Sequence, residues 1–73
     1  MSRISSSAML SEAADRMRVR HAGSLAVVED NEVIGRIHDG DIARAVAAGL
    51  DPRITPVKHV MEDTRGQIHL VEP

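Results

Sequence analysis

The chain has 73 residues, which is enough for one small domain. It contains no cysteine, phenylalanine, tryptophan or tyrosine, which excludes disulfides, thiolate metal sites and aromatic platforms for stacking bases. The net charge of −2, with both signs interspersed, argues against a nucleic-acid binder, and no apolar run is long enough to span a membrane.

So small a core favours association with a partner, because a domain of this size buries only about 60% of its unfolded surface. Neither disulfides nor aromatic residues are present to add stability. We therefore expect a partner surface, most simply that of a second copy of the chain.

The first part of the chain predicts a polar lead-in followed by a helix. Residues 1–8 are polar except for Ile4 and lack the apolar core of a signal peptide, so we expect a cytoplasmic protein. From about Met9, apolar residues recur at spacings of three and four, which predicts a helix capped by a nearby serine. Gly23 is the expected end of this helix.

Two strands joined by a tight turn come next. Residues 24–28 are almost wholly apolar and predict a strand that is buried on both faces. Asp30 and Asn31 tolerate the positive φ of a hairpin turn, so residues 32–37 return as a second strand. Gly35 lies inside this strand, where it allows another backbone or a ligand to come close.

The rest of the chain predicts a second helix and a polar tail. This helix runs over residues 39–48, and Gly49 is suited to end it. Residues 57–61 carry the apolar spacing of a single helical turn. We interpret residues 62–67 as a polar linker and residues 68–71 as the start of another strand.

The junction between the second strand and the second helix holds most of the candidate site residues. Here His38, Asp39, Gly40 and Asp41 stand where a helix N-terminus presents unpaired backbone N–H groups. The Asp41 carboxylate can accept hydrogen bonds from the hydroxyls of a ribose, or it can pair with Arg44 three residues later. Histidine is a poor helix cap, so Asp39 is a candidate to take over the capping of this helix.

No catalytic constellation is present in the sequence. It has no glycine-rich phosphate loop and no serine in a nucleophile context, so we expect a binding protein rather than an enzyme. A weak site for a hard metal ion at His38, Asp39 and Asp41 is a remote alternative. Close metal-ligand spacing is absent among the histidines His21, His38, His59 and His69.

Four stretches, taken in order, resemble a cystathionine beta-synthase domain, usually called a CBS domain: residues 10–17, 24–29, 35–42 and 55–61. The sequence departs from the family pattern at Ala26, where proline is usual, and at His38, where threonine or serine is usual. The resemblance implies an α+β fold in which a small three-stranded sheet packs on two helices and pairs with a second copy. It assigns residues 1–61 to one repeat, and residues 62–73 to a linker and the lead-in strand of a possible second repeat.

The resemblance also implies a regulatory module that holds an adenine-containing ligand in the cleft of a CBS pair, with no required cofactor. The possible ligands are AMP, ADP, ATP and S-adenosylmethionine. Asp41 would hold the ribose, and the helix start at His38, Asp39 and Gly40 would face a phosphate.

The adenine would then lie against Ile4 and the backbone of Leu25 and Ala26, although these three residues are equally explained as a lead-in and a core strand. The alternative function is a ligand-free homodimerisation module that keeps the sheet-to-sheet contact. The replacement at His38 and the added negative charge of Asp39 favour this second hypothesis.

Overall fold

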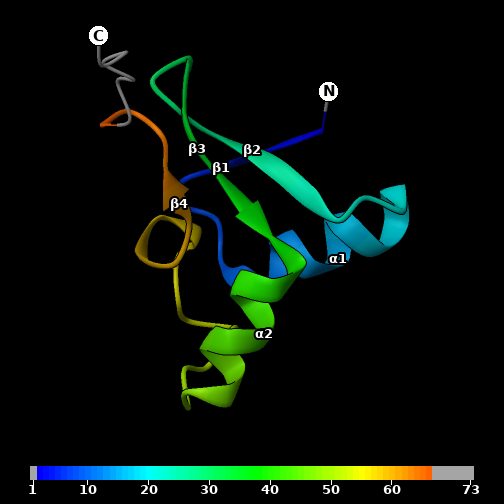
Figure 1. Cartoon of the computed structure of the whole chain (residues 1–73). Helices are drawn as coiled ribbons and strands as arrows, with labels where there is room; N and C mark the ends of the chain where they lie inside the picture. Colours follow the sequence, from blue (N-terminus) through cyan, green and yellow to red (C-terminus); the bar gives the residue numbers. More distant parts are fainter. Residues whose placement is uncertain (1, 67–73) are drawn as a thin grey trace, which may run out of the picture.

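The computed structural model describes residues 2–66 and contains a mixed sheet with the strand order β1-β2-β3-β4 (Figure 1). Strand β1 pairs parallel to β2, whereas β3 runs antiparallel to both β2 and β4. The elements are β1 (Arg3–Ser5), α1 (Leu10–Arg20), β2 (Ser24–Glu29), β3 (Glu32–His38), α2 (Asp39–Ala47), the 3-10 helix η1 (Val57–His59) and β4 (Glu62–Asp63). The α+β fold is therefore confirmed, with four strands where three were expected.

The core lies between the sheet and the two helices and consists of aliphatic side chains and one methionine. Helix α1 contacts β2, helix α2 contacts β3, and the helices contact each other. Both strands of the central pair contribute, as the apolar runs predicted. The core residues are Ile4, Leu10, Ala13, Met17, Leu25, Val27, Ile34, Ile37, Ala45 and Val57.

A shift in the pairing of β2 with β3 brings two isoleucines of one strand into this core. The register shifts between Val27 and Val28, which leaves Ile34 as an extra residue on β3. Side chains alternate between the two faces of a regular strand, so Ile34 and Ile37 would otherwise face opposite sides. The irregularity thus buries both of them.

The hairpin turn and the close approach at Gly35 follow the sequence predictions. Asp30 and Asn31 have φ values of 52° and 66°, the left-handed conformation expected for this turn. A Cβ at Gly35 would clash with the backbone carbonyl of Glu62 and would lie 3.0 Å from the sulfur of Met61. The chain that approaches Gly35 is therefore the backbone at β4, which begins the segment interpreted as a linker.

Helix α1 begins without a serine cap. Its N-cap residue is Met9, and the backbone N–H groups of Leu10 and Ser11 donate to the carbonyls of Thr55 and Pro52, both at 2.9 Å. The expectation of a side-chain cap is wrong, because carbonyls of a distant loop accept these hydrogen bonds instead.

The same loop is joined to the lead-in segment, and we call this set of contacts between residues 6–11 and 52–58 the clasp. Within it, the N–H of Val57 donates to Ala8 at 2.7 Å and that of Lys58 to Ser6 at 3.0 Å. The clasp keeps residues 52–58 against the start of α1.

A left-handed residue follows each helix, but only one of the two predicted positions is right. Gly49 follows α2 with φ 94°, as predicted. Helix α1 is closed by His21 with φ 53°, two residues before Gly23. Histidine tolerates this conformation, and the N–H of the next residue, Ala22, donates to the Met17 carbonyl at 3.0 Å.

Within residues 2–66, the helices are too short and too polar to cross a lipid bilayer. The strand start expected at residues 68–71 lies outside the described residues.

Replacing Gly35 with alanine should lower the free energy of unfolding by about 1–3 kcal/mol, because the new methyl group meets the Glu62 backbone. Denaturant unfolding monitored by circular dichroism would measure this loss. Gly23→Ala is the matched control, since its Cβ would lie 3.7 Å from the nearest atom, the Asp39 Oδ2. Equal losses in the two variants would contradict the role given to β4.

Candidate functional site

Strand β3 passes directly into helix α2, and a hydrogen bond to the side chain of Asp41 stabilises this junction. His38 is the N-cap residue, in an extended conformation with φ −107° and ψ 157°. Its backbone N–H donates to the Oδ2 of Asp41 at 2.8 Å. Asp41 is the third residue of the helix, so its carboxylate accepts a hydrogen bond that the helix itself leaves unmade.

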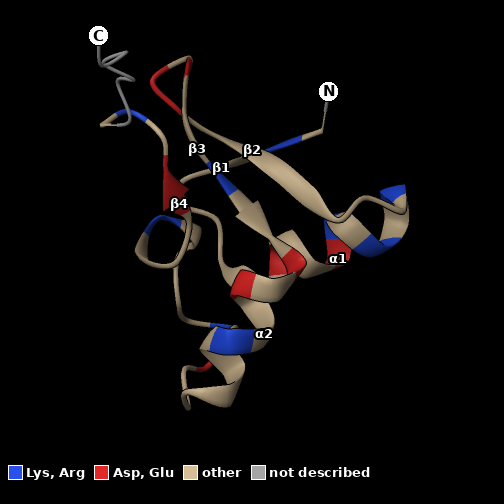
Figure 2. Cartoon of the chain, in the orientation of Figure 1, with Lys and Arg blue, Asp and Glu red and all other residues tan. Residues whose placement is uncertain are grey.

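Asp39 does not cap the helix, contrary to the sequence prediction. It is the first helical residue, and its backbone N–H donates to the carbonyl of Gly23 at 3.0 Å. Its carboxylate and that of Asp41 both lie in the first turn, where the positive end of the helix dipole stabilises negative charge. Figure 2 shows these acidic residues together at the start of α2.

The Asp41 carboxylate has partners on both oxygens. The Oδ1 atom accepts a hydrogen bond from Arg44 at 2.7 Å, and the Oδ2 atom lies 3.2 Å from the ring Nδ1 of His38. Burial raises the pKa of Asp41, but the hydrogen bonds from the His38 backbone, the His38 ring and the Arg44 guanidinium outweigh it and lower the pKa below its ordinary value. Asp41 is therefore a charged group whose side chain is only 16% exposed.

Two roles were considered for Asp41, an ion pair with Arg44 and a contact with a ribose. The structure contains the ion pair. The Arg44 side chain is 76% exposed, however, and ion pairs with so exposed a partner contribute little. The Oδ1 atom of Asp41 can thus exchange Arg44 for another donor at small cost, whereas Oδ2 is held by the backbone of His38.

The remaining candidates lie on the neighbouring strands. Leu25 and Ala26 are fully buried in β2, where Leu25 pairs with Ile37, one residue before the junction. Ile4 in β1 is 2% exposed and belongs to the core. The structure therefore groups His38 to Asp41 at one corner and places the backbone of Leu25 beside them.

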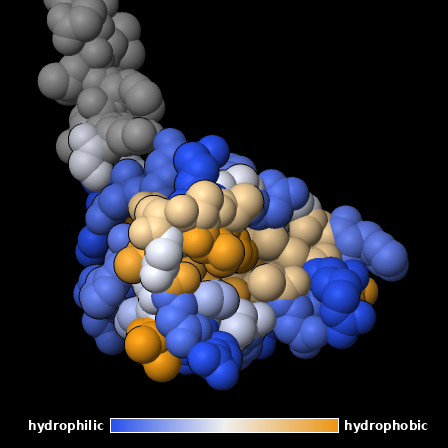
Figure 3. Space-filling model, turned by 90° about the horizontal axis from the view of Figure 1, so that it is seen from below, coloured by the Kyte–Doolittle hydropathy of each residue, from blue (hydrophilic) through white to orange (hydrophobic). Residues whose placement is uncertain are grey.

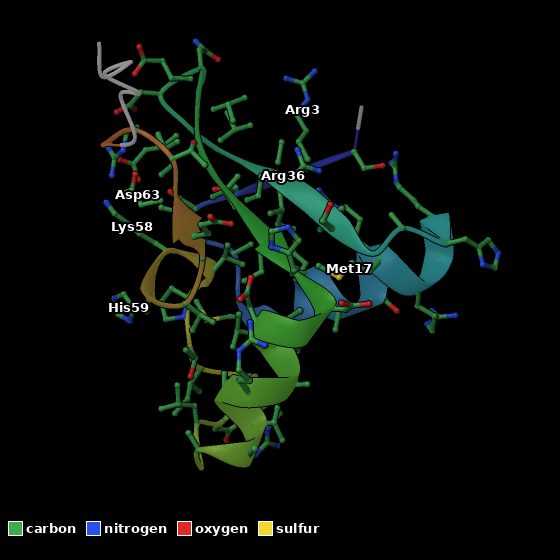
Figure 4. The ribbon with its side chains drawn as sticks, in the orientation of Figure 1. Arg3, Met17, Arg36, Lys58, His59 and Asp63 are labelled. Carbon is green, nitrogen blue, oxygen red and sulfur yellow. The ribbon has the colours of Figure 1, made fainter. Side chains whose placement is uncertain are left out.

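Two arginines on the sheet were not identified from the sequence. Arg3, Ala26 and Arg36 pair in one row across β1, β2 and β3, so their side chains share the face opposite to that of Ile37 (Figure 4). The Arg36 guanidinium donates to the Ser24 hydroxyl at 2.8 Å.

The partner of Ser24 across the sheet is His38, so the arginine row adjoins the start of α2. Positive charge at the sheet face therefore lies next to negative charge at the helix start. The alternation of Arg36 with His38 was the signal available in the sequence, but Arg3 joins them only through the strand pairing.

No cluster of three or more metal-ligating side chains occurs among residues 2–66. In particular, His38, Asp39 and Asp41 do not form such a group, although the sequence left a hard metal ion open as an alternative. The chemistry that this corner can provide is hydrogen bonding and charge, with both donors and acceptors at a strand end.

A family model for the CBS domain matches residues 3–48, which is more than half of the chain. The match runs from β1 to the end of α2 and includes each candidate site residue. A comparison with curated proteins gave no match.

Solved structures with this fold include several CBS domain proteins. A CBS domain protein fused to a Zn-ribbon-like domain has a TM-score of 0.80 and 26% identity, over 89% of this chain and 94% of that one. A conserved protein from Pyrococcus horikoshii has a TM-score of 0.78 and 31% identity, over 86% of this chain and 48% of that one.

Hypoxic Response Protein I, described with two coordinated zinc ions, has a TM-score of 0.78 and 28% identity, over 84% of this chain and 52% of that one. The chain thus spans about half the length of the latter two proteins.

Replacing Asp41 with asparagine should lower the free energy of unfolding at pH 7 by about 0.5–2 kcal/mol, because the N–H of His38 loses a charged acceptor. The pKa of Asp41 is lower in the folded than in the unfolded chain, so its stabilisation is present above the unfolded pKa. That stabilisation is lost as the pH falls through the folded pKa. The gap between wild type and variant should therefore close in acid.

Urea unfolding at a series of pH values would measure this gap. Asp39→Asn is the matched control, because it removes an acid from the same helical turn without removing the bond to His38. A loss at Asp39 as large as that at Asp41, or a gap that persists in acid, would contradict the assignment.

Proposed function

The chain belongs to the CBS domain family, and from this premise we propose that it is a regulatory module that binds an adenine nucleotide or an adenosyl compound. CBS domain proteins are typically regulatory or ligand-binding modules. The ligand would be AMP, ADP, ATP or S-adenosylmethionine, held where β3 meets α2 in a pair of chains.

The observation that carries this proposal is the state of Asp41. Its carboxylate is charged, mostly buried and fixed at one oxygen by the backbone of His38, while the other oxygen contacts the exposed Arg44. A charged carboxylate with one exchangeable oxygen can accept hydrogen bonds from ribose hydroxyls once Arg44 has moved away. Rigid placement of the acceptor lowers the cost of ordering the site when the ligand binds.

Charged groups around Asp41 would attract or repel the phosphate groups of the ligand. Backbone N–H groups at the helix start near Asp39 and Gly40 favour an anion, but the Asp39 carboxylate opposes one. Arg36 and Arg3, on the adjoining sheet face, supply positive charge that offsets Asp39. In this proposal the base lies along β2, beside the backbone of Leu25 and Ala26, as the family resemblance implies.

The open face of the sheet is where a second copy would complete the cleft. The row of Arg3, Ala26 and Arg36 lies on the face away from the core, and Val33 is 52% exposed near the hairpin. Packing of two such faces would place the start of α2 from each copy at the rim of a shared cleft.

The second candidate function is a homodimerisation module without a ligand. The specific observation in its favour is that both Asp41 oxygens already have partners, so the carboxylate has a complete structural role. In this alternative His38 and Asp39 mark a site that has lost its ligand, and the sheet-to-sheet contact remains.

Isothermal titration calorimetry with AMP, ADP, ATP and S-adenosylmethionine separates the two functions. We expect heat of binding from at least one of them and a loss of about tenfold or more in affinity in Asp41→Ala, because a charged acceptor is removed. Arg44→Ala is the control, since it frees the Oδ1 of Asp41 and should bind as well as wild type or better.

The binding proposal is wrong if none of the four compounds produces heat at millimolar concentration. The role proposed for Asp41 is wrong if Asp41→Ala, shown by its circular dichroism spectrum to be folded, binds as tightly as wild type. Absence of heat from all four compounds, together with a sedimentation coefficient that corresponds to a dimer, supports the dimerisation module instead.

A further inference from the structure

Three basic side chains have no acidic partner within residues 2–66. Six of the nine lysines and arginines form ion pairs with an aspartate or a glutamate, at 2.7 to 3.4 Å. The exceptions are Arg3, Arg20 and Arg36. Two of these, Arg3 and Arg36, lie in one row of the sheet on either side of Ala26, and we call these three residues the arginine row (Figure 4). Positive charge is thus left without a counter-charge at one place on the open sheet face.

The geometry of the arginine row allows both guanidinium groups to reach one anion. Neighbouring strands lie about 4.8 Å apart, so about 10 Å separates the backbone of Arg3 from that of Arg36. Between them stands only the methyl group of Ala26. This residue is fully buried although it is not part of the core cluster, which indicates that the long side chains on either side lie over it. An anion above Ala26 would therefore have a guanidinium group on each side.

The arginine row is also within reach of the candidate site at the start of α2. Arg36 donates to the Ser24 hydroxyl at 2.8 Å, and Ser24 pairs with His38, the N-cap residue of the helix. Two residues along a strand span about 7 Å, which a long arginine side chain can bridge. A ligand with one phosphoryl group at the helix start would therefore present its next phosphoryl groups to the arginines.

The surroundings of the arginine row leave this positive charge available to a ligand. Glu62 of β4 pairs with Arg36 in the strand register, on the side away from Ala26, and no ion pair joins the two among the described residues. The underside of the molecule is different in character, because apolar atoms gather across its centre in the view from below (Figure 3). An anionic ligand is therefore better matched by the open sheet face than by the underside.

We propose that the arginine row binds a chain of two or more phosphoryl groups, so that the site prefers a nucleoside diphosphate or triphosphate to AMP and to S-adenosylmethionine. Guanidinium groups form charge-assisted and often bidentate hydrogen bonds with phosphate oxygens. The single phosphoryl group of AMP would lie at the helix start and would not reach the row. S-adenosylmethionine carries positive charge on its sulfonium and amino groups, which the two arginines repel.

The preference among adenine compounds rests on the proposed function, whereas the binding of a phosphoryl chain does not. Inorganic triphosphate has neither a base nor a ribose, so it needs only the arginines. It is therefore the probe that tests the arginine row by itself.

Isothermal titration calorimetry with inorganic triphosphate, in buffer without magnesium, tests this site. Arg3→Gln and Arg36→Gln should each weaken binding by about tenfold, because each removes a charged hydrogen-bond donor. Arg20→Gln is the matched control, since it removes the same charge from the last residue of α1. Screening of distant charges by salt should keep its affinity within about twofold of wild type. Circular dichroism checks that each variant is folded.

Two further measurements locate the site and test its selectivity. In nuclear magnetic resonance spectra, the backbone amide signals of Arg3, Ala26 and Arg36 should shift most when triphosphate is added. In calorimetry, affinity should fall in the order ATP, ADP, AMP, with S-adenosylmethionine weakest. The preference for ATP over AMP should disappear in the double variant Arg3→Gln/Arg36→Gln.

The proposal is overturned if inorganic triphosphate does not bind at roughly millimolar concentration. It is also overturned if the Arg3 and Arg36 variants bind triphosphate like wild type, or if AMP or S-adenosylmethionine binds as tightly as ATP. After any of these results the proposed function still stands, provided that one adenine compound produces heat. Conversely, arginine-dependent binding of triphosphate with no heat from the four adenine compounds would remove the proposed function and support the arginine row as a polyphosphate site.

Discussion

The clasp between residues 6–11 and 52–58 is the constraint on which the rest of the fold depends. The first backbone N–H groups of α1 need acceptors, and the carbonyls of Pro52 and Thr55 supply them. The same contacts seat Val57, a fully buried side chain, against the core. A core without aromatic residues has few side chains large enough to close it, so the segment after α2 completes the domain. The family model ends at residue 48, before this segment begins.

Local chemistry made the main elements predictable. Apolar spacing gave both helices, and Asp30 with Asn31 gave the hairpin, because each signal lies within a few consecutive residues. The features that escaped prediction depend on distant partners. Strand β4 consists of two acidic residues with little intrinsic preference for a strand, and it can pair with β3 because Gly35 has no side chain in its way. The cap of α1 likewise comes from carbonyls about 40 residues away, which no local pattern reveals.

In the candidate site, too, the features set by neighbouring residues could be predicted, whereas those set by distant residues could not. Asp41 and its pairing with Arg44 could be foreseen, because residues three apart on a helix are neighbours. The hydrogen bond from the His38 backbone N–H fixes the same carboxylate, so Asp41 both stabilises the start of α2 and offers an acceptor at the strand end. The arginine row could not be foreseen, since Arg3 and Arg36 become neighbours only through the register of three strands. The structural role of Asp41 thus coincides with the binding role that we propose for it.

The outer strands of the sheet are very short, with three residues in β1 and two in β4. An outer strand with many free N–H and carbonyl groups is a template on which other chains add strand by strand, and this leads to fibres and aggregates. Strands of this length offer little such template. Any further copy of the chain would therefore meet it through a face rather than through a strand edge. The short outer strands thus lower the risk that such a small domain polymerises strand by strand.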